Sequence, residues 1–244
     1  MRVRPEHRQR DHRVRLEWGA AGAALLAAEC AAVVVVDVLS FGTAVDVAVG
    51  RGAAVLPQRY DDPAAALQEA VERGAVPAGD RHGPGPSLRP SSLTRLEPGT
   101  RIALPSPNGA TLCALAAGGR AEVVAGCLRN ASAVGAFLRD VDGPVGVVPA
   151  GERWPDGALR VSVEDLLGAG AIVAGLDGRS PEADAAATLF SARFAAASDL
   201  RATLGALASG RELLADGFGA DVDLAAELDV SDAVPVLRDG FLTA

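Results

Sequence analysis

Short apolar runs, each followed by a helical pattern or a polar cluster, recur along this chain. Five runs have the length and apolar content of buried strands: 31–36, 52–56, 101–104, 121–125 and 145–148. Helical patterns follow at 43–49, 61–73, 108–117, 130–139 and 163–176, and the C-terminal part is largely helical at 181–197, 199–208, 210–215 and 220–227. Strand alternating with helix predicts a three-layer α/β/α fold with a mostly parallel or mixed central sheet.

The organisation of the chain is that of one domain. Residues 1–15 carry six arginines and no apolar periodicity, so we expect a basic, flexible N-terminal tail. Residues 16–244 then form a single α/β/α domain. The segment 77–99 is rich in Pro, Gly and Ser and predicts a long loop, and long loops inside compact domains are commonly functional.

Polar clusters stand directly after several of the predicted strands. In open α/β sheets, ligands bind outside the carboxyl ends of the strands, so these clusters are expected to converge on one crevice. Asp37 follows four consecutive valines, and a carboxylate there can bind Mg²⁺, act as a base or simply cap a helix. The deep apolar strand favours a functional role near the crevice floor.

Two of the clusters have the composition of anion sites at helix starts. Ser106, Asn108 and Gly109 lie between a strand and a helix, where backbone N–H groups bind anions and glycine allows close approach. The same Pro-Asn-Gly stretch is also a common turn. Asn108 is expected to cap this helix and Asn130 the next one, after Cys127, just as Asp61 or Asp62 is expected to cap the helix at 61–73. A buried structural role is favoured for Cys127, because no histidine is clearly available to activate it.

Acidic residues farther along the chain supply further candidates. Glu164 and Asp165 sit in the first turn of a predicted helix, where they are either metal ligands, a general acid/base pair or charges that complement the helix dipole. Glu152 follows a strand in a glycine-flanked loop and is a weaker candidate. The acidic residues of the C-terminal part are expected to form a solvated face: Asp221, Asp223, Asp229 and Asp232.

The amino-acid composition limits the ligands, metals and catalytic groups that this chain can use. The net charge is −8 and the chain has no lysine, which argues against nucleic-acid binding and excludes Schiff-base and P-loop lysines. Three dispersed cysteines and three histidines give little material for a zinc site, so a bound metal would be held by oxygen ligands, as Mg²⁺ or Mn²⁺ is. No apolar run is long enough for a membrane span, and we expect a cytoplasmic protein. An apolar helix surface in the Ala-rich C-terminal third would suit a homodimer.

Several of these segments together resemble the 2-phosphosulfolactate phosphatase family. The stretches that carry the resemblance occur in family order over about residues 31–237: Val35–Leu39 with Thr43, Gly79-Asp80-Arg81, Ser106–Gly109, Gly126-Cys127 with Asn130-Ala131, Ala150-Gly151, Glu164-Asp165 with Ala169-Gly170, and Gly217-Phe218 through Asp221, Asp229 and Val234-Pro235. No single stretch is decisive, and their combination is specific.

The resemblance implies an α/β/α phosphomonoester hydrolase of coenzyme M biosynthesis that uses Mg²⁺ and a small acidic phosphoester. On that basis Asp37, with Glu164 or Asp165, is expected to hold the metal. Asp80 is then a candidate general acid or base beside Glu164 and Asp165. The residues expected to bind substrate are Thr43, Arg81, Ser106, Asn108, Gly109 and Asn130.

The chain departs from the family pattern at positions expected to take part in binding an anion. Ser40 stands where the family has an arginine, and Asp80 shortens the family's glutamate. A lost arginine removes a planar, bidentate cation, for which Arg81 or Arg89 could substitute. A non-catalytic anion-binding relative, or a hydrolase or lyase of a different acidic metabolite, therefore stands beside the phosphatase hypothesis.

Overall fold

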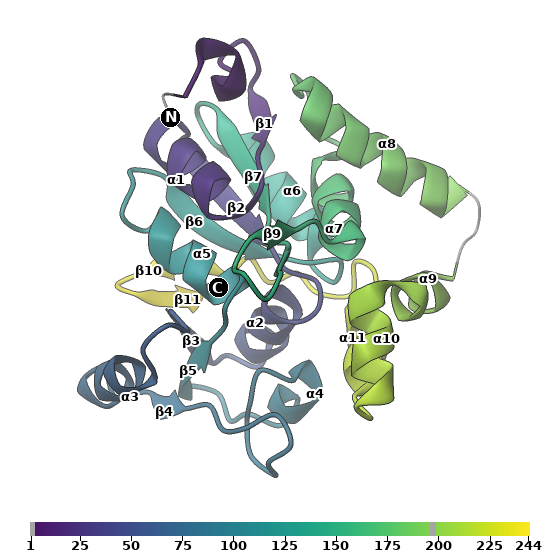
Figure 1. Cartoon of the computed structure of the whole chain (residues 1–244). Coiled ribbons are helices and arrows are strands. Elements are labelled where there is room, and N and C mark those ends of the chain that lie inside the picture. The colour runs from purple at the N-terminus through teal and green to yellow at the C-terminus, as the bar shows by residue number, and fades with distance from the viewer. Residues whose placement is uncertain (1–2, 196–198) are drawn as a thin grey trace.

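The computed structural model describes residues 3–195 and 199–244 and has the predicted three-layer α/β/α architecture (Figure 1). Within these residues a nine-stranded sheet has the order β1-β7-β2-β6-β10-β11-β3-β5-β4. Its strands are β1 (Val14–Leu16), β2 (Ala32–Val36), β3 (Ala54–Gln58), β4 (Val76–Pro77), β5 (Arg101–Pro105), β6 (Glu122–Gly126), β7 (Val145–Pro149), β10 (Val236–Arg238) and β11 (Phe241–Thr243). A separate hairpin joins β8 (Glu152–Arg153) to β9 (Leu159–Arg160).

Helices cover both faces of this sheet. They are a 3₁₀ turn η1 (Pro5–Arg8), α1 (Gly19–Glu29), α2 (Phe41–Gly50), α3 (Pro63–Glu72), α4 (Pro90–Leu93), α5 (Gly109–Ala116), α6 (Ala131–Asp140), α7 (Val163–Val173), α8 (Pro181–Ala195), α9 (Leu200–Ala206), α10 (Ala208–Ala215) and α11 (Gly219–Ala225). Among the described residues, none of these helices combines the length and the apolarity that crossing a bilayer requires.

The sheet consists of two parallel halves that run in opposite directions. Strands β1, β7, β2 and β6 pair in parallel, as do β3, β5 and β4. The C-terminal hairpin β10–β11 joins the halves through three successive antiparallel pairings, which reverse the strand direction. The carboxyl ends of β2 and β5 nevertheless meet, because the N–H of Gly109, after β5, donates to Asp37, after β2. The crevice therefore lies where two opposed half-sheets face each other.

Strand β2 shows why its continuous valine run is buried on both sides. Val33 and Val35 pack into one core cluster with α1, α2 and α5, whereas Val34 and Val36 pack into another with α6, α7 and α8. Alternate side chains of a strand point to opposite faces, so each valine pair serves one helix layer. The polypeptide leaves this strand at Asp37, which is only 5% exposed.

The N-terminal segment corrects the expected flexible tail. Val14, Arg15 and Leu16 form the edge strand β1, which pairs in parallel with β7. Arg8, Arg10 and Arg15 all form ion pairs with Glu29 at the end of α1. The arginines that suggested a solvated arm therefore fasten residues 8–16 to the domain.

The other helices and strands lie close to the positions that the sequence predicts. The strands and helices of the βα units are confirmed, with ends that shift by a few residues. Helix α1 lies in a stretch for which no element was predicted, because its Ala-rich sequence has no clear polar face. The hairpin β10–β11 was also not predicted, since its strands are only three residues long. Residues 196 and 197 of the helix predicted at 181–197 lie outside the described residues.

The predicted helix caps are right in one case and wrong in two. Asp62 caps α3 by accepting from the N–H groups of Ala64 and Ala65. Asn108 and Asn130 occupy the positions before α5 and α6, but neither side chain caps its helix. Each amide is held instead by a contact from a distant part of the chain, described below.

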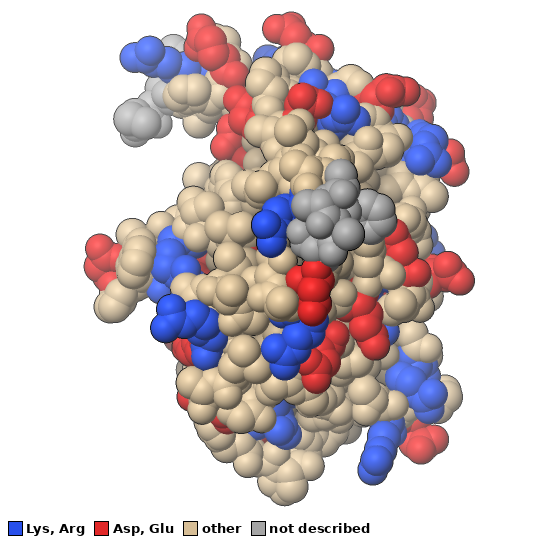
Figure 2. Space-filling view, turned by 90° about the vertical axis from the view of Figure 1, so that its right-hand side faces the viewer, with Lys and Arg blue, Asp and Glu red and all other residues tan. Residues whose placement is uncertain are grey.

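Charged side chains are mixed on the face that Figure 2 shows. Arginines and acidic residues lie interspersed there rather than gathered into a basic stripe.

Candidate active site

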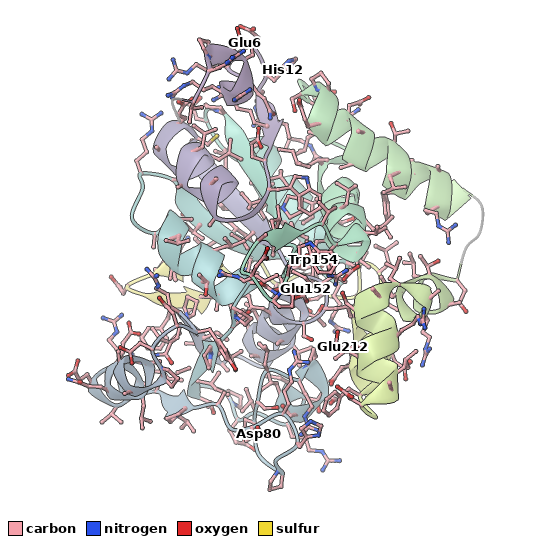
Figure 3. All side chains as sticks on the ribbon, in the orientation of Figure 1. Glu6, His12, Asp80, Glu152, Trp154 and Glu212 are labelled. Carbon is pink, nitrogen blue, oxygen red and sulfur yellow. The ribbon has the colours of Figure 1, made fainter. Side chains whose placement is uncertain are left out.

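A cavity of about 530 Å³ opens where the carboxyl ends of β2 and β5 meet. Five of the predicted site residues line it: Asp37, Asp80, Arg81, Ser106 and Asn108. Ser40, Tyr60, His82, Glu152, Ser209, Glu212 and Leu213 are among its other lining residues. Figure 3 shows Asp80, Glu152 and Glu212 in the lower half of the view, each on a separate segment of the chain. His12 lies at the top of the same view.

Asp37 is held rigidly at the floor of this cavity. Its Oδ1 accepts from the N–H of Phe41 at 3.1 Å, and its Oδ2 accepts from the N–H of Gly109 at 2.9 Å. The first bond closes the turn from β2 into α2, and the second ties this turn to the start of α5. The carboxylate therefore has a fixed orientation at the junction of the two half-sheets.

The environment of Asp37 disfavours an isolated negative charge. Burial raises its pKa to about 7, and the charge of Glu152 adds to the rise. The two backbone N–H groups and Arg81 act in the opposite direction but do not cancel it. The pKa of Glu152 is also raised, again mainly by burial. Two neighbouring carboxylates thus lie in a site whose own residues do not fully compensate their charge.

Asp165 does not line the cavity, and its carboxylate accepts from two backbone N–H groups. Its Oδ1 accepts from the N–H of Val38 at 2.8 Å, and its Oδ2 accepts from the N–H of Gly151 at 2.9 Å. Burial, followed by the charges of Asp37 and Glu164, raises its pKa well above the usual range. Glu164 is likewise buried and does not line the cavity. Asp165 therefore positions the segments that carry Asp37 and Glu152.

Arg81 brings a positive charge to the cavity, as was expected of it if it substitutes for the arginine that Ser40 replaces. Its Nη2 donates to Oγ of Ser40 at 3.0 Å, so the guanidinium from the 77–99 loop lies against the residue at which the resemblance led us to expect an arginine. Ser40 is only 4% exposed. A positive group is thus present at this place in the cavity, although it comes from a different segment of the chain.

The Ser106–Gly109 turn contacts both Asp37 and Glu152. Gly109 donates its N–H to Asp37, and the N–H of Asn108 donates to Oγ of Ser106 at 3.2 Å. Nδ2 of Asn108 donates to Oε2 of Glu152 at 2.8 Å. The N–H of Gly109, the first residue of α5, is therefore occupied by Asp37, and Asn108 orients the second carboxylate of the site.

Two residues expected to bind substrate are buried away from the cavity. Thr43 donates its Oγ1 hydroxyl to the carbonyl of Val38 at 2.8 Å and so braces the turn that carries Asp37. Asn130 accepts from the N–H of Cys127 at 2.9 Å and donates to the carbonyl of Ala233 at 3.1 Å. Neither side chain is exposed or lines the cavity. Burial raises the pKa of Cys127 to about 12, in keeping with a structural thiol.

The C-terminal helices complete the cavity from residues that the sequence analysis did not connect with it. Ser209, Glu212 and Leu213 of α10 line one wall, and Arg160 of the β8–β9 hairpin donates to Oγ of Ser209 at 2.9 Å. No local signal marks these residues, because only the packing of α10 brings them to the site. Tyr60 and His82 are also contributed by loops.

The acidic C-terminal face is also corrected at one position. Asp221 is 2% exposed, and its Oδ1 accepts from the N–H of Ser91 at 2.8 Å. It thereby ties α11 to α4, at the end of the 77–99 loop. The loop that carries Asp80 and Arg81 is thus fastened to the C-terminal helices.

The oxygen donors of the cavity fit Mg²⁺, although not through the predicted set. Of Asp37, Glu164 and Asp165, only Asp37 lines the cavity. Within residues 3–195 and 199–244 no three His, Cys, Asp or Glu side chains are grouped as a ready metal cage. Mg²⁺ usually binds through one or two carboxylates together with waters and substrate phosphate. Asp37 and Glu152, whose charges are incompletely compensated, meet that requirement.

The chain is similar to known proteins over most of its length. The family model for 2-phosphosulpholactate phosphatase matches residues 24–240. A 2-phosphosulfolactate phosphatase of Methanothermobacter thermautotrophicus is 28% identical over 214 residues, which cover 85% of this chain and 87% of the relative. A probable 2-phosphosulfolactate phosphatase of Carboxydothermus hydrogenoformans is 31% identical over 222 residues, which cover 88% and 90%. The chain belongs to the 2-phosphosulfolactate phosphatase family and is an enzyme of the phosphoric monoester hydrolase class.

Proposed function

We propose that this chain is a Mg²⁺-dependent phosphatase that hydrolyses a small phosphomonoester, with 2-phosphosulfolactate as the first substrate to be tested. The observation that carries this proposal is the buried carboxylate of Asp37, which is fixed at the cavity floor by Phe41 and Gly109 beside the carboxylate of Glu152. A phosphatase needs such a site to hold the charge of the phosphoryl group in a defined position.

Asp37 and Glu152 would hold the metal ion. When bound, Mg²⁺ supplies charge neutralisation to the phosphate oxygens and lowers the pKa of a water molecule. The two backbone N–H bonds of Asp37 preorganise its carboxylate, so binding requires no reorientation at the cavity floor. The bond from Asn108 orients Glu152 in the same way.

The other groups of the cavity bind and orient the phosphoester. Arg81 is placed to bind phosphate oxygens with its guanidinium, while its contact with Ser40 holds it at the cavity. Asp80, whose Oδ1 accepts from the N–H of His82 at 2.7 Å, lines the cavity near Arg81 in sequence and could exchange a proton with the leaving oxygen. The arginine supplied by Arg81 favours a working phosphoester site over a relative that lost its chemistry with the family arginine.

The test is phosphate release from 2-phosphosulfolactate and other phosphorylated hydroxy acids by the purified full-length protein. Release should require Mg²⁺, stop in excess EDTA and return when Mg²⁺ is restored. Asp37→Asn should abolish it, whereas Asp140→Asn, at an exposed position at the end of α6, should not. Undiminished release in EDTA, or from Asp37→Asn, would overturn the proposal.

A further inference from the structure

We infer that Ser209 binds an acidic group of the substrate other than its phosphate, and that Arg160, which donates to Ser209, positions this hydroxyl and supplies the positive charge. The inference rests on the proposed function, because it concerns the same cavity and the same class of phosphoester. The two residues come from different elements, the β8–β9 hairpin and helix α10, and meet at the wall of the cavity.

The side chains that line the cavity carry more negative than positive charge. Among the described lining residues one is an arginine, Arg81, and four are acidic: Asp37, Asp80, Glu152 and Glu212. Arg81 is assigned to the phosphate, and the metal ion to Asp37 and Glu152. A substrate with a further acidic group therefore needs another positive partner, since a desolvated anion without one is strongly disfavoured.

Arg160 is placed to act on this cavity. In the hairpin it lies opposite Glu152, and its Nη2 donates to Oγ of Ser209 at 2.9 Å. Glu152 and Ser209 both line the cavity. Burial raises the pKa of Glu152, whereas the bond from Asn108 and then the charge of Arg160 lower it. The positive charge of Arg160 thus reaches a group inside the cavity.

Most hydrogen-bond donors of Arg160 are unused. A guanidinium has five N–H groups, and within residues 3–195 and 199–244 only Nη2 of Arg160 has a hydrogen-bond acceptor, the hydroxyl of Ser209. Cζ lies over the ring of Trp154, 6.0 Å from the ring centre, and this contact requires no N–H group. The side chain is half-buried. A partly desolvated guanidinium with spare donors is well suited to stabilise a bound anion.

Ser209 can pass this positive charge into the cavity. Its side chain is buried, at 6% exposure, and its Oγ accepts from Arg160, so the hydroxyl hydrogen is available to donate to another group. A hydroxyl that is polarised by a cation becomes a stronger donor. Ser209 also lies in the first turn of α10 (Ala208–Ala215), where the helix dipole favours an anion.

A matched series of esters tests this inference. Isopropyl phosphate, 2-phospholactate and 2-phosphosulfolactate carry, besides the phosphate, no acidic group, a carboxylate, and a carboxylate with a sulfonate. For Arg160→Ala in saturating Mg²⁺ we expect kcat/KM to fall by about 10- to 100-fold for the ester whose acidic group is bound. Isopropyl phosphate should lose no more than about twofold, because it has no such group.

The point in the series at which the loss begins identifies the bound group. A loss that begins with 2-phospholactate assigns the site to the carboxylate, and a loss confined to 2-phosphosulfolactate assigns it to the sulfonate. An equal loss for all three esters would overturn the inference, because a structural role of Arg160 affects every substrate alike. Weaker metal binding does not explain a loss, since the charge of Arg160 opposes that of a cation at Glu152.

Further variants tie the effect to this pair of residues. Ser209→Ala should give the same dependence on the ester, and Ser209→Thr, which keeps a hydroxyl, should recover part of the loss. Arg160→Lys should also recover part, because it keeps the charge and loses the paired donors. Arg153→Ala removes an exposed arginine of the same hairpin that does not line the cavity, and should leave all three kcat/KM values near those of the unmodified protein. A loss in Arg153→Ala equal to that in Arg160→Ala would overturn the inference.

Binding of the organic product separates this inference from the phosphatase proposal. In calorimetric titrations with Mg²⁺, sulfolactate should bind Arg160→Ala about 10- to 100-fold more weakly than the unmodified protein, whereas inorganic phosphate should bind both equally. If no ester is hydrolysed but this difference holds, the proposed function fails and the inference stands. Equal binding of sulfolactate to both proteins would overturn the inference, whatever the hydrolysis assay shows.

Discussion

Oδ2 of Asp37 accepts a hydrogen bond of 2.9 Å from the backbone N–H of Gly109, across the junction of the two half-sheets. The two residues are 72 positions apart, and each follows a strand of a different half. A Cβ atom at position 109 would lie 2.6 Å from Cδ1 of Phe41 and 2.7 Å from Oδ2 of Asp37. The contact thus requires glycine, because any side chain would displace the carboxylate at the cavity floor.

We therefore expect Gly109→Ala to damage the active site more than the fold. The methyl group would push Asp37 away from its position, and a displacement of about 1 Å can cost about 100-fold in rate. Steady-state assay of phosphate release should show kcat/KM lowered by about 100-fold. Gly50→Ala is the matched control, since no atom lies within 4 Å of the Cβ it would introduce. Near-normal activity of Gly109→Ala would contradict the requirement for a fixed Asp37.

Asp165→Ala should lower both stability and activity. The change removes the acceptor of two buried N–H groups, those of Val38 and Gly151, and each unpaired donor costs about 1–3 kcal/mol. Urea unfolding at pH 7 should show a free energy of unfolding that is lower by about 2 kcal/mol or more. Activity should fall because the segments of Asp37 and Glu152 lose their common tie. Asp140→Ala, at an exposed position, is the control variant. An unchanged free energy of unfolding for Asp165→Ala would mean that water replaces the carboxylate as the acceptor of the two N–H groups.

Arg81→Ala should weaken substrate binding without unfolding the protein. Arg81 is half-buried and donates to Ser40, and a hydrogen bond to a charged group contributes about 1.5–3 kcal/mol. We expect kcat/KM for phosphoesters to fall by about 10- to 100-fold, with Arg81→Lys recovering part of the loss. The exposed Arg95, which does not line the cavity, is the control for removal of an arginine. Activity of Arg81→Ala equal to that of Arg95→Ala would assign phosphate binding to another group.

Glu29→Gln should weaken the attachment of the N-terminal segment in a pH-dependent way. The hydrogen bond from Arg10 is the main cause that lowers the pKa of Glu29, with Arg8 adding to it. A carboxyl group whose pKa is lowered on folding stabilises the protein above its unfolded pKa, and this contribution disappears as the pH falls through the folded pKa. Differential scanning calorimetry should give a lower Tm for the variant at pH 7 and a smaller difference towards pH 4. A difference that is constant with pH would show that the carboxylate charge is not responsible.

Much of the fold could be predicted from the sequence because it depends on local pattern. The valine run of β2 could only be a strand buried on both faces, and Asp62 before Pro63 marked the start of α3. The short strands β10 and β11 could not be found in this way, because three residues carry too little pattern to be told from a loop. Their position decides how the two half-sheets are joined.

The candidate site likewise contains residues that the sequence could identify and residues whose place only the packing decides. Asp37, Asp80, Arg81, Ser106 and Asn108 were identified from their places after strands or from the family resemblance, and all five line the cavity. Thr43 was expected from the resemblance and Asn130 from its place after a strand, yet both side chains are buried and bond to backbone groups. Sequence position fixes which end of a strand a residue occupies, whereas the direction of its side chain depends on what packs around it.

The sequence alone determined the α/β/α architecture, the family and the acidic, lysine-free chemistry of the crevice, since these follow from residue type, order and periodicity. Only the tertiary structure decided that Glu152, and not Asp165, lines the cavity together with Asp37. It also decided that Arg81 lies against Ser40 and that α10 closes the wall. These relationships join residues that are tens of positions apart, and they arise from the packing of two opposed half-sheets that no local pattern specifies.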